Sequence, residues 1–439
     1  MSRLSGFPEY LPAERAVEQS VLDHLRSTFE LHGFASVETR AVEPMDVLLR
    51  KGEIDKEVYL LRRLHAEETD DHAGLGLHFD LTVPFARYVV ENAGELDFPF
   101  RRYQVQKVWR GERPQQGRFR EFTQADIDIV GRDTLPAHFD VEIAQVMAEA
   151  LGGLPIPGAV LQVSNRKILE GFYLGLGVAD PTAVMQVVDK LDKLPGERIT
   201  ALLVEQGLGA AQAEACLALA AICTPDTSFV AQVQALGVDH PMLAEGLDEL
   251  AGLVAAVRTP PNVTVQADLR IARGLDYYTG TVFETRLVGH EHLGSVCSGG
   301  RYEQLARDNR STYPGVGISL GVSRLLTPLF AGGLTASRSV PSVVLVALAD
   351  EEDRAAATDT AARLRARGIA TEVAPSAAKF GKQIRHAERR GIPFVWFGSA
   401  DGDQVKDIRS GEQVTADADT WSPDHRDLRP QVISKETPQ

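Results

Sequence analysis

Residues 101–131 constrain the fold more than any other stretch, because two extended segments flank a polar turn that contains Gly and Pro. Such a pattern predicts a long antiparallel hairpin. Side chains alternate between the two faces of a strand. One face is therefore expected to be apolar and to pack as ordinary core, with Tyr103, Val105, Trp109, Ala125, Ile127 and Ile129.

The opposite face of this hairpin is unusual for a surface that water covers. It carries Gln104, Gln106, Arg110, Phe122, Gln124, Asp126 and Asp128, and the tip adds Arg113, Arg118 and Arg120. A solvated sheet face is the alternative, but Lys, Glu and Thr are the usual residues there. Gln and Arg beside an aromatic ring indicate the floor of a binding site.

A length of 439 residues suggests two or three domains, and 44% apolar with 24% charged residues is typical of globular proteins. The 3 cysteines (Cys216, Cys223 and Cys297) cannot build a disulfide framework, and no cluster has zinc spacing, so no metal is assigned to protein side chains. The sequence has no apolar signal core and no run long enough to cross a membrane. We therefore expect a cytoplasmic protein without a membrane partner.

The net charge of −15 argues against general binding of polyanions, because phosphate neutralisation needs clustered cations. Two local basic patches are present all the same. Residues 101–120 hold seven Lys or Arg against one acid, and residues 379–390 hold five against one.

The patterns along the chain predict its domain organisation. Sheet-forming segments occupy residues 1–164 and 262–331, whereas residues 165–261 are rich in Ala, Leu, Glu and Gln and predict a mostly helical insertion. Residues 332–342 form a Gly/Ser/Pro linker. Alternating strands and helices then predict a small α/β domain over residues 343–423, and residues 424–439 are expected to be a polar, disordered tail.

Three further segments carry candidate site residues. Residues 75–83 alternate and lead into a helix, which puts Asp80 and Thr82 on one strand face; a helix cap is the alternative for Asp80. Residues 273–284 (RGLDYYTGTVFE) hold adjacent tyrosines, which cannot both point inward on a strand, so an aromatic corner is the structural alternative. Residues 298–302 (SGGRY) follow.

Residues 313–324 predict a Gly-rich strand that enters a helix. The glycine spacing fits neither the dinucleotide fingerprint nor the phosphate-binding loop, and glycine here would let a flat ligand or a second backbone come close. Arg324 lies in the first turn of that helix, which disfavours a cation unless an anion binds nearby.

The first 330 residues thus combine several arginines with carboxylates, Gln124, Phe122 and a set of tyrosines. Arginine grips phosphate bidentately and is always charged. An aromatic ring on the same floor can stack on a purine, and the carboxylates can bind an ammonium group. The inventory describes a site for a nucleotide and an amino acid.

Over nearly its whole length the chain resembles the histidyl-tRNA synthetases, a family of the class II aminoacyl-tRNA synthetases. The resemblance rests on the segment at residues 33–44, on RGERPQQGRFREF and GVGISLGVSRL, and above all on RGLDYYTGTVFE and SGGRYE. It implies an α+β catalytic core on an antiparallel sheet with a helical insertion, plus a C-terminal anticodon-binding α/β domain. A homodimer is also implied.

The resemblance further implies a reaction and a role for each site residue. The enzyme would activate L-histidine with ATP and Mg²⁺ to histidyl-adenylate and then transfer histidine to tRNA-His. ATP would be bound by Arg110, Glu112, Arg118, Phe122 and Arg324. Histidine would be bound by Asp80, Thr82, Arg110, Gln124, Asp128, Arg273, Tyr277, Tyr278 and Tyr302, with Arg110 and Arg273 as the catalytic pair. Asp80 departs from the longer Glu that is common in the family's bacterial form.

For tRNA, the resemblance points to the hairpin tip with Arg113 and to the basic segment with Lys379, Lys382, Arg385 and Arg389. The main alternative is a catalytically inactive synthetase-like protein that acts as a regulatory subunit in histidine biosynthesis. Such paralogues lose the histidine signatures and the anticodon domain, and this chain has both.

Overall fold

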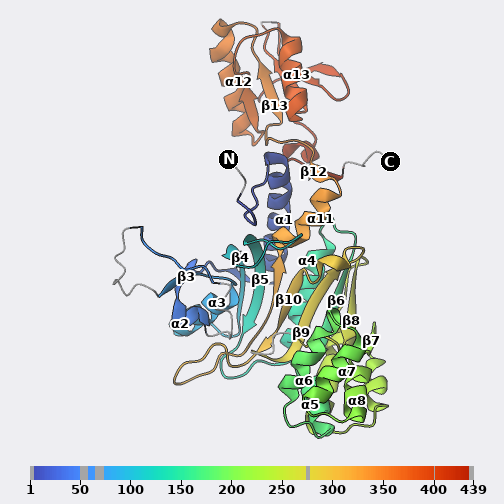
Figure 1. Cartoon of the computed structure of the whole chain (residues 1–439). Coiled ribbons are helices and arrows are strands. Elements are labelled where there is room, and N and C mark those ends of the chain that lie inside the picture. Colours follow the sequence, from blue (N-terminus) through green and yellow to red (C-terminus); the bar gives the residue numbers. More distant parts are fainter. Residues whose placement is uncertain (1–3, 50–57, 65–73, 273–276, 400, 435–439) are drawn as a thin grey trace. The chain divides into compact units, whose positions relative to one another are not determined.

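The computed structural model describes residues 4–49, 58–64, 74–272, 277–399 and 401–434 (Figure 1). The chain divides into two compact units. The first contains Met1–Pro8 and Leu22–Pro328, and the second contains Glu9–Val21 and Leu329–Gln439. No helix within the described ranges is long and apolar enough to cross a membrane.

A nine-stranded sheet is the framework of the first unit. Its strands, in spatial order, are β1 (Ala35–Ser36), β4 (Phe100–Trp109), β5 (Glu121–Val130), β11 (Gly315–Gly321), β10 (Cys297–Tyr302), β9 (Tyr278–Leu287), β6 (Ala159–Asn165), β8 (Val263–Asp268) and β7 (Cys223–Thr224). All pairs from β4 to β6 are antiparallel, while β1 with β4 and β6 with β8 are parallel. The predicted antiparallel core is confirmed.

The hairpin at the start of this sheet has the two faces that alternation predicts. Strands β4 and β5 pair so that Gln104 lies opposite Asp126 and Gln106 lies opposite Gln124. On the other face, Ala125, Ile127 and Ile129 have no exposed surface. On β5 the apolar face is core, as is Tyr103 on β4, whereas Val105 and Trp109, which were also expected in the core, are only half-buried.

The first unit also contains the helices α2 (Met45–Leu48), α3 (Thr82–Glu91) and α4 (His138–Gly152). The helices α1 (Pro12–Leu31) and α11 (Val322–Ala331) are divided between the two units. The short strands β2 (Val42–Pro44) and β3 (Leu75–Leu77) pair with each other. Helix α4 packs on β5 and β11. The segment at residues 33–44, which contributes to the family resemblance, contains two short strands in two different sheets. One of them, β1, joins the edge of the large sheet.

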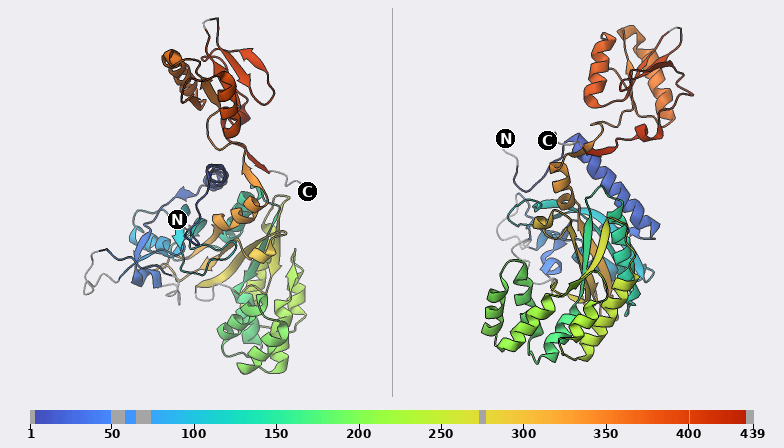
Figure 2. Two further views of the ribbon diagram at one scale, coloured as in Figure 1. Left: turned by 45° about the horizontal axis from the view of Figure 1, so that its top comes forward. Right: turned by 90° about the vertical axis from the view of Figure 1, so that its right-hand side faces the viewer.

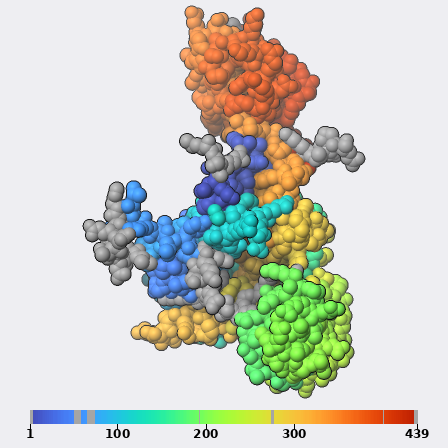
Figure 3. Space-filling model, viewed as in Figure 1, coloured from blue at the N-terminus to red at the C-terminus, as the bar shows by residue number. Residues whose placement is uncertain are grey.

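The segment predicted to be a helical insertion contains α5 (Arg166–Gly175), α6 (Pro181–Val188), the 3-10 turn η3 (Asp189–Asp192), α7 (Gly196–Glu205), α8 (Ala210–Ala220), α9 (Phe229–Gln234) and α10 (Pro241–Ala256). Asn165 and Asp180 cap the first two helices with their side chains. Figure 2 shows these helices beside the edge of the sheet that holds β7 and β8, and in Figure 3 they form a distinct green lobe. Strand β7 lies inside this segment and pairs with β8.

The second unit contains a five-stranded mixed sheet, as the predicted α/β domain requires. Its strands are β14 (Thr371–Val373), β13 (Val344–Ala347), β15 (Phe394–Phe397), β16 (Gln404–Asp407) and β17 (Gln413–Thr415), and its helices are α12 (Arg354–Ala366), after the turn η5 (Glu351–Asp353), and α13 (Phe380–Arg390). Trp396 is fully buried in its core and donates its indole N–H to Asp403 over 2.9 Å.

The expected linker and the expected disordered tail both differ from prediction. Part of the linker is β12 (Leu334–Ala336), which pairs antiparallel with β18 (Val432–Ser434) from the tail, after the turn η6 (His425–Leu428). Composition did not indicate this, because the pairing joins segments far apart in sequence. The last described residues are an integral part of the second unit.

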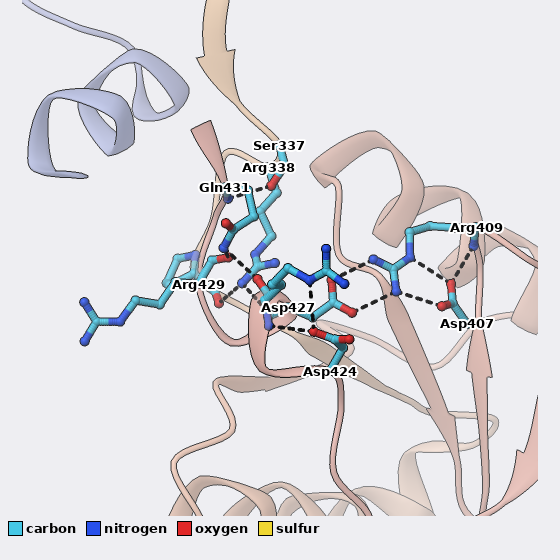
Figure 4. A network of polar contacts seen from close by, with 10 residues as sticks. Ser337, Arg338, Asp407, Arg409, Asp424, Asp427, Arg429 and Gln431 are labelled. Carbon is cyan, nitrogen blue, oxygen red and sulfur yellow. Dashed lines mark hydrogen bonds and ion pairs between the residues drawn. The ribbon is translucent and has the colours of Figure 1, made fainter. Parts of the chain in front are cut away.

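Arg338 holds this arrangement together (Figure 4). Its guanidinium is buried and donates to the backbone oxygens of Val340, Pro341 and Asp427. The Asp427 carboxylate, in turn, accepts from Arg409 over 2.7 and 2.9 Å. The arginine thereby ties the linker to the turn that precedes β18.

We predict that Arg338→Met loosens the pairing of β12 with β18. The substitution leaves buried carbonyls without donors, which should lower the free energy of local opening by about 1–3 kcal/mol. Hydrogen exchange of residues 334–336 and 432–434 should become faster, whereas the exposed Arg429→Met should not change it. Equal exchange in both variants would contradict the role of Arg338.

Candidate active site

A cavity of about 380 Å³ opens on the polar face of the large sheet. It brings together the predicted residues Asp80, Thr82, Arg110, Glu112, Arg118, Phe122, Gln124, Asp128, Tyr277, Tyr278, Tyr302 and Arg324. Arg273 lies outside the described residues. Arg113 is exposed at the hairpin tip and does not line the cavity.

Asp80 and Thr82 are not on a strand, contrary to prediction. Strand β3 ends at Leu77 and α3 begins at Thr82, so both side chains belong to the start of a helix. Asp80 is buried, and its Oδ1 accepts from the backbone N–H of Val83 over 3.1 Å. The Asp80 carboxylate therefore both caps the start of α3 and lines the cavity.

One group of contacts centres on Asp128. Its Oδ2 lies 2.7 Å from Nη2 of Arg102, and its Oδ1 accepts from the Tyr302 hydroxyl over 2.9 Å. Arg102 has no exposed surface, and its guanidinium lies 4.2 Å from the centre of the Phe85 ring. The Asp128 carboxylate is therefore held in one orientation by an ion pair and a phenol.

The tyrosines of this group remain protonated. Burial, followed by the charge of Asp128, raises the pKa of Tyr302. Burial and the neighbouring Tyr277 raise the pKa of Tyr278. Both phenols are therefore neutral and available as hydrogen-bond donors at physiological pH.

Two glycines of β11 make room for these side chains. A Cβ on Gly317 would lie 2.2 Å from Oδ1 of Asp128, and a Cβ on Gly315 would lie 2.4 Å from the Tyr302 ring. The Gly-rich strand was expected to admit a ligand or a second backbone. At these two positions it admits side chains of the site itself.

A second group of contacts joins the arginines around Phe122. The Arg110 guanidinium lies 5.2 Å from the centre of the Phe122 ring, and its Nε donates to the backbone oxygen of Phe79 over 3.0 Å. Glu112 lies 3.3 Å from Arg118 and 3.9 Å from Arg110. Arg110 and Arg118 thus supply positive charge close to the flat ring of Phe122.

Arg324 lies next to the same group. It belongs to the first turn of α11, as predicted, and donates to the backbone oxygen of Leu293. A Cβ on Gly117 would lie 3.3 Å from its Cγ, so the hairpin tip and the helix start are in contact. The arginines of the two segments therefore face one cavity.

Sequence reasoning gave no role to several residues that build or line the cavity: Arg102, Asp126, Glu284 and Ser319. Alternation along the hairpin already puts Arg102 and Asp126 on the polar face. Asp126 is 2% exposed, and burial raises the pKa of its carboxyl group to about 7. Glu284 ends the segment RGLDYYTGTVFE, so its position in a candidate motif was the available signal.

The basic segment predicted in the second unit forms α13. Lys379 precedes the helix, and Lys382, Arg385 and Arg389 are exposed at a spacing that puts them on one face. Gln383 on the buried side bonds to the backbone N–H and oxygen of Leu348, over 2.9 and 2.7 Å, and fixes the helix to the sheet. The helix thus presents a row of cations on a rigid support.

Comparison with known proteins places these features in a family. Residues 6–325 match the family model described as histidyl-tRNA synthetase, and residues 342–419 match that of an anticodon binding domain. The chain is 61% identical to the histidine–tRNA ligase of Cutibacterium acnes, over 98% of each chain. It is 59% identical to that of Micrococcus luteus, again over 98% of each.

Solved structures agree with the sequence comparison. The crystal structure of histidyl-tRNA synthetase from Nostoc sp. PCC 7120 is similar with a TM-score of 0.84 and 34% identity, over 95% of this chain and 97% of that one. The fold, the cavity and these matches lead to one conclusion: the chain belongs to the histidyl-tRNA synthetase family.

Proposed function

We propose that the protein is a histidine–tRNA ligase, which activates L-histidine with ATP and transfers the histidyl group to the 3′ end of tRNA-His. The observation that carries the proposal is the single cavity that joins the arginine group around Phe122 to the carboxylate and tyrosine group around Asp128. The two groups suit a nucleotide and an amino acid that must react with each other.

The arginine group would bind ATP. Phe122 would stack on adenine against Arg324, with Glu112 at the adenine edge. Arg118 and Arg324 would hold the γ-phosphate end, and Arg110 the α-phosphate, since guanidinium groups bind phosphate bidentately. Mg²⁺ would enter with ATP as part of the substrate complex.

The carboxylate group would bind histidine. Asp80, Thr82 and Gln124 would take the α-ammonium group, and Arg110 the carboxylate. Asp128 and Tyr278 would bind the imidazole, with Tyr277 lining the pocket and Tyr302 near the ammonium side. The ion pair of Asp128 with Arg102 supports this, because it fixes an acceptor for an imidazole N–H.

The chemistry is an in-line attack of the histidine carboxylate on the α-phosphorus, which yields histidyl-adenylate and pyrophosphate. Orientation and stabilisation of the developing charge drive such a step, so no protein nucleophile is required. Arg110 and Arg273 would stabilise that charge from two sides. The terminal hydroxyl of the tRNA then displaces AMP and takes the histidyl group.

Arg113 at the hairpin tip would contact the acceptor end of the tRNA, and the exposed cations of α13 would contact its anticodon arm. The match of residues 342–419 to an anticodon binding domain supports the second assignment. It also disfavours the regulatory-subunit alternative, as does the retention of both histidine signatures. A cytoplasmic homodimer is proposed from the resemblance.

Histidine-dependent exchange of pyrophosphate into ATP tests the activity directly. We predict exchange by the purified protein, and a loss of roughly 10²–10³-fold in Arg110→Ala, since one donor to developing charge is removed. Arg273→Ala should abolish exchange and still bind ATP. Absence of exchange in folded wild-type protein would refute the enzyme assignment.

The close approach of Gly317 to Asp128 generates a second prediction. Gly317→Ala pushes the carboxylate out of place, so we expect the KM for histidine in exchange to rise roughly tenfold or more, with ATP binding retained. Gly94→Ala, whose Cβ meets nothing within 4 Å, serves as the control. An unchanged KM would show that Asp128 does not need this orientation.

A third prediction concerns the basic helix. The triple variant Lys382→Ala, Arg385→Ala and Arg389→Ala should charge tRNA-His with a KM for tRNA roughly 10-fold higher and with a weaker salt dependence, because phosphate contacts are lost. Pyrophosphate exchange should be unchanged, since these residues belong to the second unit. Normal charging would refute the tRNA role of this face.

A further inference from the structure

Two buried acceptor atoms belong to residues that are neighbours on the polar face of β5, Gln124 and Asp126. Both residues line the cavity and are 6% and 2% exposed. Among the described residues, Oε1 of Gln124 and Oδ1 of Asp126 have no hydrogen-bond partner. Buried acceptors without a donor are costly, so each of these atoms is able to accept a hydrogen bond from a ligand or a water.

Ser319 on β11 fixes the orientation of both side chains. Nε2 of Gln124 donates to its Oγ over 2.6 Å, and the Ser319 hydroxyl is hydrogen-bonded to Asp126. Since Oγ already accepts from Gln124, its one proton is available for the carboxylate of Asp126. Because the amide nitrogen is directed at Ser319, Oε1 of Gln124 remains as a buried acceptor beside the cavity.

Among the described residues, the charged groups that face Asp126 leave it without a counter-ion of its own. The facing groups are Arg102 on β4, Asp128 on β5, Asp80 before α3, Cys297 and Tyr302 on β10, and Ser319 on β11. Arg102 is the only cation among these, and it pairs with Asp128 at 2.7 Å. A buried carboxylate without its own counter-ion is stabilised by a cation that enters with the ligand.

We propose that Asp126 is a binding residue for the α-ammonium group of histidine, and that Ser319 is its positioning residue. The proposal rests on the proposed function and deepens it. An alkylammonium has three N–H donors. Oδ1 of Asp126, Oε1 of Gln124 and the Asp80 carboxylate supply three acceptors. Oδ1 of Asp80 already accepts from the backbone N–H of Val83 at the start of α3. The Asp126 carboxylate therefore adds a second negative charge for the ammonium group.

The arrangement has a consequence for pH. Burial raises the pKa of Asp126 to about 7, the proximity of Asp128 and Asp80 adds to this, and Arg102 and Ser319 act in the opposite direction. Below that pH the carboxyl group of the free protein is protonated, and it must ionise to accept an ammonium. Since kcat/KM reports on groups of the free enzyme, kcat/KM for histidine should fall as pH drops through 7.

Calorimetric titration of the full-length protein with three probes tests the assignment. Histidine and histidinol carry the ammonium group, whereas imidazole-4-propionate carries the ring and a carboxylate without it. Asp126→Asn, which keeps the shape and removes the charge, should weaken histidine and histidinol binding roughly 10- to 100-fold. Binding of imidazole-4-propionate and of ATP should be unchanged. Ser319→Ala should show a smaller loss with the same selectivity.

The pH profile separates an electrostatic role from a merely structural one. The fall of kcat/KM for histidine through pH 7 should be weaker in Asp126→Asn than in wild type, because the titrating carboxyl is gone. The exposed Asp97→Asn serves as the matched control and should retain the wild-type profile.

Three outcomes would overturn the assignment. These are equal losses for all three probes, an unchanged histidine affinity in Asp126→Asn, and an unaltered pH profile in that variant. A wild-type protein that fails to bind histidine at all would instead refute the proposed function, so the two failures are distinguishable.

Discussion

The buried ion pair between Arg102 and Asp128 is the interaction on which the site depends. Burial of two charges costs several kcal/mol per ion unless the geometry and further hydrogen bonds compensate. Here the register of β4 and β5 puts the two residues directly opposite each other. Phe85 covers the guanidinium, and the Tyr302 hydroxyl takes the remaining carboxylate oxygen. Loss of either charge would leave the other inside the sheet without this ion pair.

This pair also explains why the face of β5 is divided. Arg102 is paired with Asp128, so among the described residues the next carboxylate along the strand, Asp126, has the Ser319 hydroxyl and more distant charges. Two carboxylates two residues apart on the same strand are therefore not equivalent. One is a permanently oriented anion, and the other has a charge that depends on what occupies the cavity.

Much of this could be predicted from sequence, because period-2 alternation is a local property. Alternation predicted the β5 core face of the hairpin and the residues on its polar face. The glycine pattern predicted that a strand leads into α11. The nine-strand order could not be predicted in the same way, because β11 lies between β5 and β10 through long-range pairing. The location of Asp80 was also missed, because a three-residue strand gives too short a pattern to separate strand from helix start.

The role of Arg102 remained hidden for a related reason. Alternation puts it on the polar face, but only the register of two strands shows that its partner is Asp128. The pairing of β12 with β18 is a similar long-range contact. Local composition had predicted these two segments to be a linker and a disordered tail.

That pairing also bears on how the second unit folds during synthesis. Its compact body draws on Glu9–Val21 near one end of the chain and closes with Val432–Ser434 near the other. Contacts between segments so distant in sequence form late, because the intervening chain must first emerge from the ribosome. The sheet around β13 can assemble earlier, but β12 remains without its partner strand until β18 has been synthesised. Until β18 arrives, the open edge of β12 is a place where a nascent chain is exposed to chaperones and to mispairing.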